Sequence, residues 1–521
     1  MEDDELNLLN KRKKGLLRII FSRTGIIMLL LLLAIGFFIM VQALFAEFLI
    51  HIFGGVGIFN MIVIIALLNS DMDSSAKLTW ILVVSVTSIF GALFYLFTKL
   101  SLGSRAVGKD CEELIRTHRE DIKQDKQVYE SLATVSRETV ELVDYLNRSG
   151  TFPVTAHNKV VYFPLGEKKW ASMLDDLRKA EKFIFLEYFI VSEGRMWGTV
   201  LKILAEKAAQ GVEVRLMYDG TCAIALLPYS YPEMAEKYGI KCKMFSPLTP
   251  FVSTHYNYRD HRKILVIDGK VGYTGGVNLS DEYINHIEVF GHWKDTAVRI
   301  EGRAVRNLTL MFLNMWSLGE KSPDYAPYIA PEPECFYGES GFVIPYGDNP
   351  YDRDKVGEKV YMDILNRADS YVHIMTPYLI LDDELMTSLK YAAERGIDVK
   401  IIFPGIPDKK AVYALGKTYF RSLLESGVKI YLYTPGFVHA KVFVSDDIKA
   451  VVGTINLDYR SLYHHFECAA YMYGTDCIHD IEKDFSETLE KCSLVTFDTI
   501  KHERFIVKLV GSFMRLLAPL L

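Results

Sequence analysis

Two short motifs of identical spacing contain the residue types best suited to chemistry. Each has a histidine, a lysine two residues later, an aspartate seven residues after the histidine and an asparagine seventeen residues after it. The two copies comprise His261, Lys263, Asp268 and Asn278, and His439, Lys441, Asp446 and Asn456. One copy of so short a pattern is weak support for a function. Its repetition, with the same downstream glycine, strongly indicates a functional site.

These side chains suit in-line substitution at a phosphodiester. Residues i and i+2 of a strand share a face, so each histidine projects together with its lysine, while each aspartate falls at the turn beyond the strand. If the motifs face each other across a pseudo-twofold axis, one histidine attacks phosphorus and the other protonates the departing alkoxide. Lysine and asparagine donors stabilise the nonbridging oxygens. We therefore expect no metal and no cofactor, and the symmetry leaves the two histidine roles unassigned.

The elements that must hold these motifs occur twice along the chain. Residues 183–190 predict a strand, which a helix, Gly211 and a second strand follow, and residues 371–380 begin the same order again with Gly396. A repeat at a spacing of about 180 residues is typical of a duplicated domain. We expect an α/β fold of two α/β/α domains with pseudo-twofold symmetry, right-handed crossovers and largely parallel sheets. The helical stretch 197–209 is expected to face the core.

Composition limits the function classes. The 521-residue chain is 50% hydrophobic and has a net charge of -6, which argues against a nucleic-acid partner because such binding depends on lysine and arginine. The excess of apolar residues is concentrated in the first hundred positions. The seven scattered cysteines form no C-x-x-C pair and indicate neither a disulfide framework nor a zinc site.

The N-terminal region predicts membrane helices. Residues 25–46 and 78–98 carry no charge and are each long enough to span a bilayer, and residues 48–68 form a third span or a partly embedded helix. Basic residues precede the first span and follow the last one, which favours an even number of crossings and a cytoplasmic catalytic region. Three spans would place that region outside, so the number of crossings stays open. We expect a multi-pass protein of the cell membrane.

Composition and the repeat together predict the domain boundaries. We expect a membrane region with two or three transmembrane helices over residues 1–100, a helical connector over 101–147, a first catalytic domain over 148–330 and a second over 331–521. The second ends in an amphipathic segment, 505–521, which could pack on the core or lie on a bilayer surface, with core packing favoured.

The two motifs and the segments around them resemble the phospholipase D superfamily and, within it, the bacterial cardiolipin synthases. The similar segments are residues 257–269, Trp293 to Asp295, Thr376 to Tyr378, residues 435–441, Asp458 to Ser461 and the C-terminal Pro-Leu-Leu. The resemblance implies duplicated phospholipase D-like domains behind N-terminal transmembrane helices. It also implies that one phosphatidylglycerol donates its phosphatidyl group to a histidine and releases glycerol, after which a second phosphatidylglycerol takes the group to form cardiolipin.

The resemblance further implies residue roles. His261 is expected to be the nucleophile and His439 the general acid and base, Glu467 to orient a catalytic histidine, and Asp295 to be its first-half counterpart. Asp268 and Asp446 are expected to brace their motifs. The family often has arginine where this chain has Lys294, and an amide where it has His465. His464 and His465 could line the cleft, although a histidine at each position alone is more typical of a structural role. Tyr188 and Tyr378 could either contact a headgroup or pack in the core.

Other readings of the same motifs remain open. A phospholipase D would deliver the phosphatidyl group to water with the same side chains, and acceptor choice depends on a pocket that the sequence does not show. A nuclease-like phosphodiesterase is disfavoured by the apolar N-terminal region and the acidic balance. A non-catalytic lipid-binding scaffold is disfavoured because both motifs are intact.

Overall fold

The chain forms two compact units. The computed structural model describes residues 5–9, 36, 40, 53–99, 102–247, 258–329, 334–352 and 354–520. Of these residues, the larger unit contains those up to Leu8 and residues 106–247 and 258–515, and it holds both histidine motifs. The smaller unit contains the helices that lie between residues 53 and 99. The domain boundary expected near residue 330 stays a prediction.

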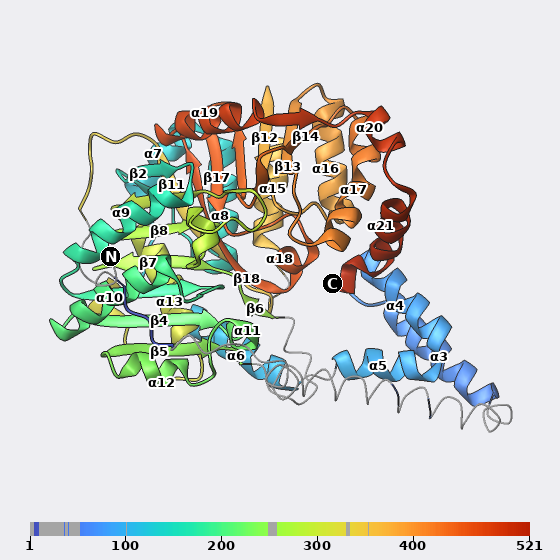
Figure 1. Cartoon of the computed structure of the whole chain (residues 1–521), viewed down its shortest axis with the longest axis horizontal. Coiled ribbons are helices and arrows are strands. Elements are labelled where there is room, and N and C mark those ends of the chain that lie inside the picture. Colours follow the sequence, from blue (N-terminus) through green and yellow to red (C-terminus); the bar gives the residue numbers. More distant parts are fainter. Residues whose placement is uncertain are drawn as a thin grey trace. The chain divides into compact units, whose positions relative to one another are not determined.

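A seven-stranded sheet carries the first motif, in the order β2-β10-β8-β7-β3-β4-β5. Figure 1 shows β4 and β5 in green beside the helices α10 and α12. The elements are β2 (Lys159–Phe163), α9 (Gly166–Lys179), β3 (Phe183–Tyr188), α10 (Arg195–Ala209), β4 (Glu213–Asp219), α11 (Cys222–Ala225), α12 (Tyr231–Glu236), β5 (Ile240–Phe245), β7 (Lys263–Ile267), β8 (Val271–Gly275), β10 (Ala297–Glu301) and α13 (Val305–Trp316).

A ten-stranded sheet carries the second motif, in the order β1-β11-β18-β17-β16-β12-β13-β14-β19, with β6 paired to β18. The elements are β1 (Thr155–Ala156), β6 (Arg259–Asp260), β11 (Phe342–Asp348), α15 (Val356–Asn366), β12 (Tyr371–Met375), α16 (Asp383–Glu394), β13 (Asp398–Pro404), α17 (Lys410–Glu425), β14 (Lys429–Tyr433), β16 (Val442–Ser445), β17 (Lys449–Gly453), α18 (Tyr459–Tyr463), β18 (His465–Tyr473), α19 (Cys477–Leu489) and β19 (Cys492–Leu494). A small two-stranded sheet pairs β9 (His292–Lys294) with β15 (Gly436–Val438).

The two sheets are mixed, so the expectation of largely parallel sheets is wrong. The strands β3, β4 and β5 pair in parallel, as do β12, β13 and β14. The strands β7 and β8 after the first motif pair antiparallel, as do β16 and β17 after the second. The cause is local, because the turns at Asp268 and Asp446 have positive φ angles of 54° and 56° and join neighbouring strands over a few residues. So short a connection permits only antiparallel pairing.

The repeat that the sequence predicts is present as a duplicated α/β fold. Helix α10 runs between β3 and β4, and α16 runs between β12 and β13. Gly211 and Gly396 follow these helices with φ angles of +92° and +94°. Glycine adopts this left-handed conformation at little cost, so both helices stop at the equivalent point and the chain enters the next strand.

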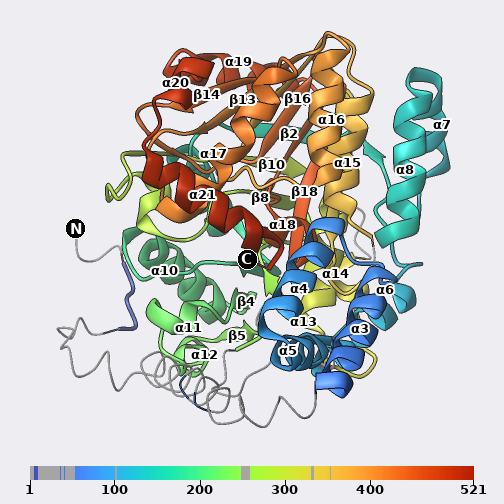
Figure 2. The same cartoon turned by 90° about the vertical axis from the view of Figure 1, so that its right-hand side faces the viewer.

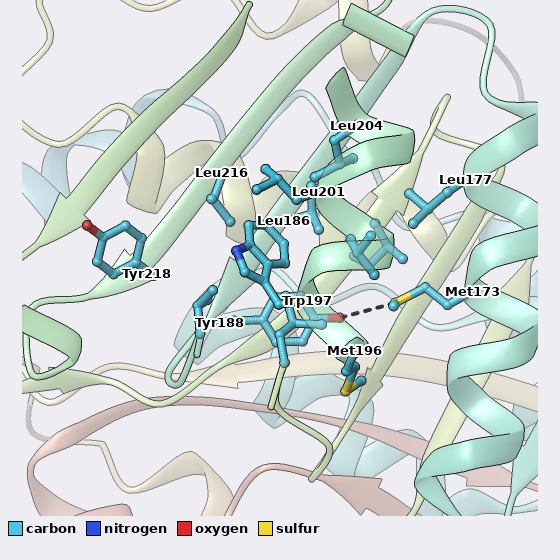
Figure 3. Close-up of a cluster of buried hydrophobic side chains, with 14 of the residues drawn as sticks. Met173, Leu177, Leu186, Tyr188, Met196, Trp197, Leu201, Leu204, Leu216 and Tyr218 are labelled. Atoms are coloured by element: carbon cyan, nitrogen blue, oxygen red, sulfur yellow. Dashed lines mark hydrogen bonds between the residues drawn. The ribbon is translucent and has the colours of Figure 1, made fainter. Parts of the chain in front are cut away.

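The stretch 197–209 lies in α10, whose inner face helps to form the core of the first domain. Figure 3 shows Trp197, Leu201 and Leu204 packed among side chains from α9, β3 and β4. Tyr188 also lies in this core, where its hydroxyl accepts a hydrogen bond from Lys169 Nζ at 3.0 Å. Tyr188 therefore packs in the core, which was one of its two expected roles, and not against a lipid headgroup.

The N-terminal helices differ from the expected membrane spans. They are α3 (Phe53–Leu68), α4 (Ser74–Thr87) and α5 (Ile89–Lys99), and no helix among the described residues is long and apolar enough to cross a membrane. The predicted single helix over 78–98 is broken at Ser88, which has a φ of 55°. Trp80 packs on Tyr95 with ring centroids 5.3 Å apart, so α5 folds back on α4. Apart from positions 36 and 40, the predicted span 25–46 lies outside the described residues.

Further helices lie before, between and after the two sheet-forming parts of the chain. They are α6 (Leu102–Thr117), α7 (Lys126–Val135), α8 (Arg137–Gly150), α14 (Ala326–Ile329), α20 (Phe497–Lys501) and α21 (Phe505–Leu517). Figure 2 shows α21 running beside α17. Gly511 allows this approach, because an added Cβ atom there would lie 2.4 Å from the carbonyl oxygen of Ala414. Phe505, Leu509 and Phe513 on α21 are exposed, so the segment 505–515 is packed on one face and open on the other.

Candidate active site

His261 is held between the two halves of the repeat. It lies between β6 and β7 in the first half, and its backbone N–H donates to the carbonyl oxygen of Phe466 on β18 at 2.9 Å. Its Nδ1 lies 2.8 Å from Oε1 and 3.0 Å from Oε2 of Glu467. The hydroxyl of Thr454 donates to the other side of the same carboxylate. The second half of the chain therefore fixes the orientation of the first-motif imidazole.

His439 has the reciprocal arrangement. It follows β15, which pairs in parallel with β9, and its backbone N–H donates to the carbonyl oxygen of Lys294 at 2.7 Å. Its Nδ1 lies 2.7 Å from Oδ2 of Asp295 in the first half. Each imidazole is thus oriented by a carboxylate from the opposite half of the chain. In both pairs Nδ1 is occupied, which leaves Nε2 as the reacting nitrogen.

Both imidazoles are buried, with 6% of His261 and 7% of His439 exposed. Burial is the main reason that the pKa of each imidazole lies well below its usual value. Lys263 from the first motif also lowers the pKa of His439 in the second, so charges of the two motifs act on each other. A neutral imidazole has a free lone pair, which is the state that a nucleophile or a base requires.

The two carboxylates differ in their charge state. Burial raises the pKa of Asp295 to about 7, although Lys441 opposes that effect. Burial alone would also raise the pKa of Glu467, but its interactions with the facing His261 and with His465 outweigh that effect and hold the pKa below its usual value. At neutral pH His261 therefore faces an anion, whereas His439 faces a carboxyl group that binds a proton near neutrality.

The two lysines of the motifs are buried beside their histidines. Burial lowers the pKa of Lys263 to about 8 and that of Lys441 to about 7. Lys263 Nζ donates to the carbonyl oxygen of His261 at 2.6 Å, and Lys441 Nζ lies 2.9 Å from Nδ1 of His439. These ammonium groups are compact positive charges in a region of low dielectric, where they interact strongly with a phosphate anion.

Asp268 and Asp446 brace the two halves in the same way. The carboxylate of Asp268 accepts hydrogen bonds from the backbone N–H groups of residues 181, 182 and 183. The carboxylate of Asp446 accepts them from residues 369, 370 and 371. Each aspartate thereby fastens its motif to the start of the neighbouring strand, β3 or β12. These oxygen atoms are engaged with the backbone and are structural in this geometry.

The two asparagines lie at equivalent positions but have different partners. Asn278 accepts from the backbone N–H of Ile190 at 3.0 Å and donates to the hydroxyl of Tyr283 at 2.7 Å. The Oδ1 atom of Asn456 is buried and has no hydrogen-bond partner among the described residues. Tyr378, the counterpart of Tyr188, is partly exposed, and its hydroxyl donates to Asp408 at 2.5 Å.

Two further residues of the site lie outside the two predicted motifs. Thr454 bonds the carboxylate of Glu467, and the ring of His465 lies 5.3 Å from that of His261, measured between centroids. The signal for His465 was available, because it lies two residues before Glu467 on the same strand and so projects to the same face. His464, on the opposite face, instead packs near Tyr258 and Tyr463.

Two groups among the described residues have the side chains and spacing to hold a metal ion. One is His261, His465 and Glu467, and the other is Glu358, Asp382 and Glu384. In the first group, Nδ1 of His261 already bonds Glu467. In the second, Asp382 caps the start of α16 by accepting from Leu385.

Comparisons with known proteins agree with this geometry. A family model described as cardiolipin synthase, phospholipase D-like domain, matches residues 173–316 and 361–489, and one described as phospholipase D-nuclease N-terminal matches residues 58–99. A cardiolipin synthase of Geobacillus kaustophilus is 39% identical over 381 residues, which cover 72% of this chain and 74% of that protein. A Streptococcus mutans protein described as uncharacterized is 56% identical over 460 residues, covering 88% of this chain and 99% of that protein.

The fold also has a match among solved structures. The crystal structure of phosphatidylserine synthase from Haemophilus influenzae aligns with a TM-score of 0.56 at 15% identity, over 74% of this chain and all of that one. At this identity the likeness concerns the fold alone. The family model covers both halves that contribute a histidine and its facing carboxylate. The chain therefore belongs to the cardiolipin synthase family of the phospholipase D superfamily, a family of phosphatidyltransferases.

Proposed function

We propose that this protein makes cardiolipin by transferring a phosphatidyl group from one phosphatidylglycerol to another, with release of glycerol. The observation that carries the proposal is the reciprocal pairing of His261 with Glu467 and of His439 with Asp295. It supplies two oriented imidazoles with buried ammonium groups beside them, which is what substitution at a phosphodiester needs. The reaction exchanges one phosphodiester for another and needs no nucleotide or metal ion.

In the first step, Nε2 of His261 attacks phosphorus. The N–P bond forms as the P–O bond to glycerol breaks. The pair of His439 and Asp295, when it holds one proton more than a neutral imidazole facing a carboxylate, gives that proton through Nε2 of His439 to the departing oxygen. The product is a phosphatidyl-histidine that carries positive charge on the ring. In the second step, His439 takes the proton of a hydroxyl on the second phosphatidylglycerol, whose oxygen attacks phosphorus and restores His261.

The difference between the two carboxylates supports these roles. The covalent intermediate places a positive charge on the nucleophile's ring, and a fixed anion beside Nδ1 stabilises that charge. Glu467 beside His261 is such an anion, whereas the raised pKa of Asp295 makes the carboxyl group beside His439 partly protonated near neutral pH. The role of general acid and base suits His439 beside Asp295, because a group in that role gains and loses a proton in each cycle.

We also place the protein at the cell membrane with its catalytic unit in the cytoplasm, because its substrates are membrane lipids and basic residues flank the apolar N-terminal region. The sequence-based expectation of several crossings remains part of this proposal. Protease protection of a C-terminal tag in sealed vesicles tests the orientation. We expect the protease to cleave the tag in inside-out vesicles and to leave it intact in right-side-out vesicles. The opposite pattern would contradict a cytoplasmic catalytic unit.

The decisive experiment incubates the purified protein with labelled phosphatidylglycerol in EDTA and identifies the products. Cardiolipin and glycerol in equal amounts are expected. Phosphatidic acid as the main product would instead identify a hydrolase, and no turnover would identify a lipid-binding scaffold. His261→Ala should abolish the reaction, and His286→Ala is the matched control, because His286 is exposed and outside the site.

A further inference from the structure

His465 is a buried histidine close to both Glu467 and His261. It opens β18, and only 8% of the residue is exposed. Neither ring nitrogen has a hydrogen-bond partner among the described residues. Its Nδ1 lies 3.7 Å from Oε1 of Glu467, which is beyond hydrogen-bond distance. Buried polar groups are nearly always hydrogen-bonded, so an exception of this kind calls for a ligand or a role.

The ring of His465 is aimed into the catalytic centre. Its ring centroid lies 5.3 Å from that of His261. The ring centroid of Phe189 lies 6.4 Å from that of His465 and 4.9 Å from that of His261. The strand's period of two turns His465 toward the same side as Glu467, while the neighbouring His464 turns toward Tyr258. His465 therefore lies beside the ring of the histidine that is proposed to attack phosphorus.

This position fits an oxygen of the reacting phosphate. In a productive complex the phosphorus atom lies about 3–3.5 Å from the attacking nitrogen. The nonbridging oxygens then project sideways from the line of attack, into the space beside the His261 ring where His465 stands. A neutral imidazole carries one N–H donor, and a phosphate oxygen is a strong acceptor.

We propose that His465 donates a hydrogen bond to a nonbridging oxygen of the phosphodiester, as a third imidazole in the catalytic centre, and that this bond is strongest in the five-coordinate transition state. The inference rests on the proposed function and adds a substrate-binding residue to it. An asparagine amide also carries an N–H donor, so it can supply the same hydrogen bond from a smaller side chain.

The test compares variants that keep or remove the donor. His465→Asn keeps an N–H and should retain kcat within about threefold. His465→Phe keeps the ring but lacks the donor, and loss of a hydrogen bond to a charged group should lower kcat by about 10- to 100-fold with KM nearly unchanged. His464→Phe is the matched control and should leave kcat at the wild-type level. Wild-type kcat in His465→Phe, or a change confined to KM, would overturn the proposal.

A second measurement is independent of turnover. Orthovanadate is a tetrahedral oxyanion that forms a five-coordinate adduct with an attacking nitrogen, so its dissociation constant reports the contacts to its oxygen atoms. It should rise by about tenfold or more in His465→Phe and stay unchanged in His464→Phe. If His465→Phe does not fold, His465→Leu takes its place. Unchanged vanadate binding in the folded variant contradicts the inference, whereas failure of the wild-type protein to make cardiolipin would contradict only the proposed function.

Discussion

Replacing Glu467 by glutamine tests the charge that is proposed to stabilise the covalent intermediate. The substitution keeps the volume of the side chain and one hydrogen bond to Nδ1 of His261 but removes the negative charge. Glu467 is fully buried and its Oε1 lies 2.8 Å from Nδ1, so little solvent screens the pair. With an effective dielectric constant of about 20, opposite charges roughly 4 Å apart attract by about 4 kcal/mol. Loss of that energy from the transition state should lower kcat by about a thousandfold.

The matched variant is Asp295→Asn on the other histidine. Because the pKa of Asp295 is raised to about 7, its carboxyl group is partly protonated near neutral pH and the substitution removes less charge. We expect a smaller loss of kcat, about tenfold to a hundredfold. The assay follows the burst of glycerol by rapid quench, with the thermal midpoint of each variant as a check on folding. A burst that survives in Glu467→Gln and vanishes in Asp295→Asn would refute the assignment of roles.

Three further outcomes are expected. Activity should fall as pH rises through about 7 to 8. The pKa values of Lys441 and Lys263 are lowered to that range, and an ammonium group loses its charge above its pKa. A reaction rate that stays constant up to pH 9 would contradict this prediction. Asp268→Ala should lower the free energy of unfolding by about 2–5 kcal/mol, because it leaves the backbone N–H groups of residues 181–183 unpaired. Chemical denaturation measures this loss, and Asp446→Ala, at the more exposed equivalent position, is the comparison variant. Dialysis against EDTA should leave turnover unchanged, whereas a loss that Zn²⁺ or Mg²⁺ restores would place a metal ion in the mechanism.

The motifs themselves could be predicted because they combine an uncommon residue pattern with exact repetition in sequence. The duplicated α/β fold followed from the same repeat. The family resemblance indicated that Glu467 orients a catalytic histidine and that Asp295 is its counterpart, but not that Glu467 faces His261 and Asp295 faces His439. Each pair joins residues more than a hundred positions apart, and no local pattern encodes such a contact.

The predictions of a single helix over residues 78–98 and of largely parallel sheets were wrong for local reasons that the hydrophobicity of the sequence does not reveal. The uncharged run 78–98 breaks at Ser88, which has a positive φ angle, and Trp80 before the break packs on Tyr95 after it. The sheets are mixed because positive φ angles at Asp268 and Asp446 turn the chain back at once. The position of His465 follows from strand periodicity, but its lack of a hydrogen-bond partner depends on side chains from distant segments.

Mapping the covalent lipid in His439→Ala tests the central claim most directly. This variant lacks the base for the second step, so the phosphatidyl group should accumulate on the enzyme after incubation with labelled phosphatidylglycerol and an alkaline quench. Digestion and mass spectrometry should place the label on His261, with none in the double variant His261→Ala/His439→Ala. Label on a residue other than His261 would contradict a mechanism in which His261 attacks phosphorus.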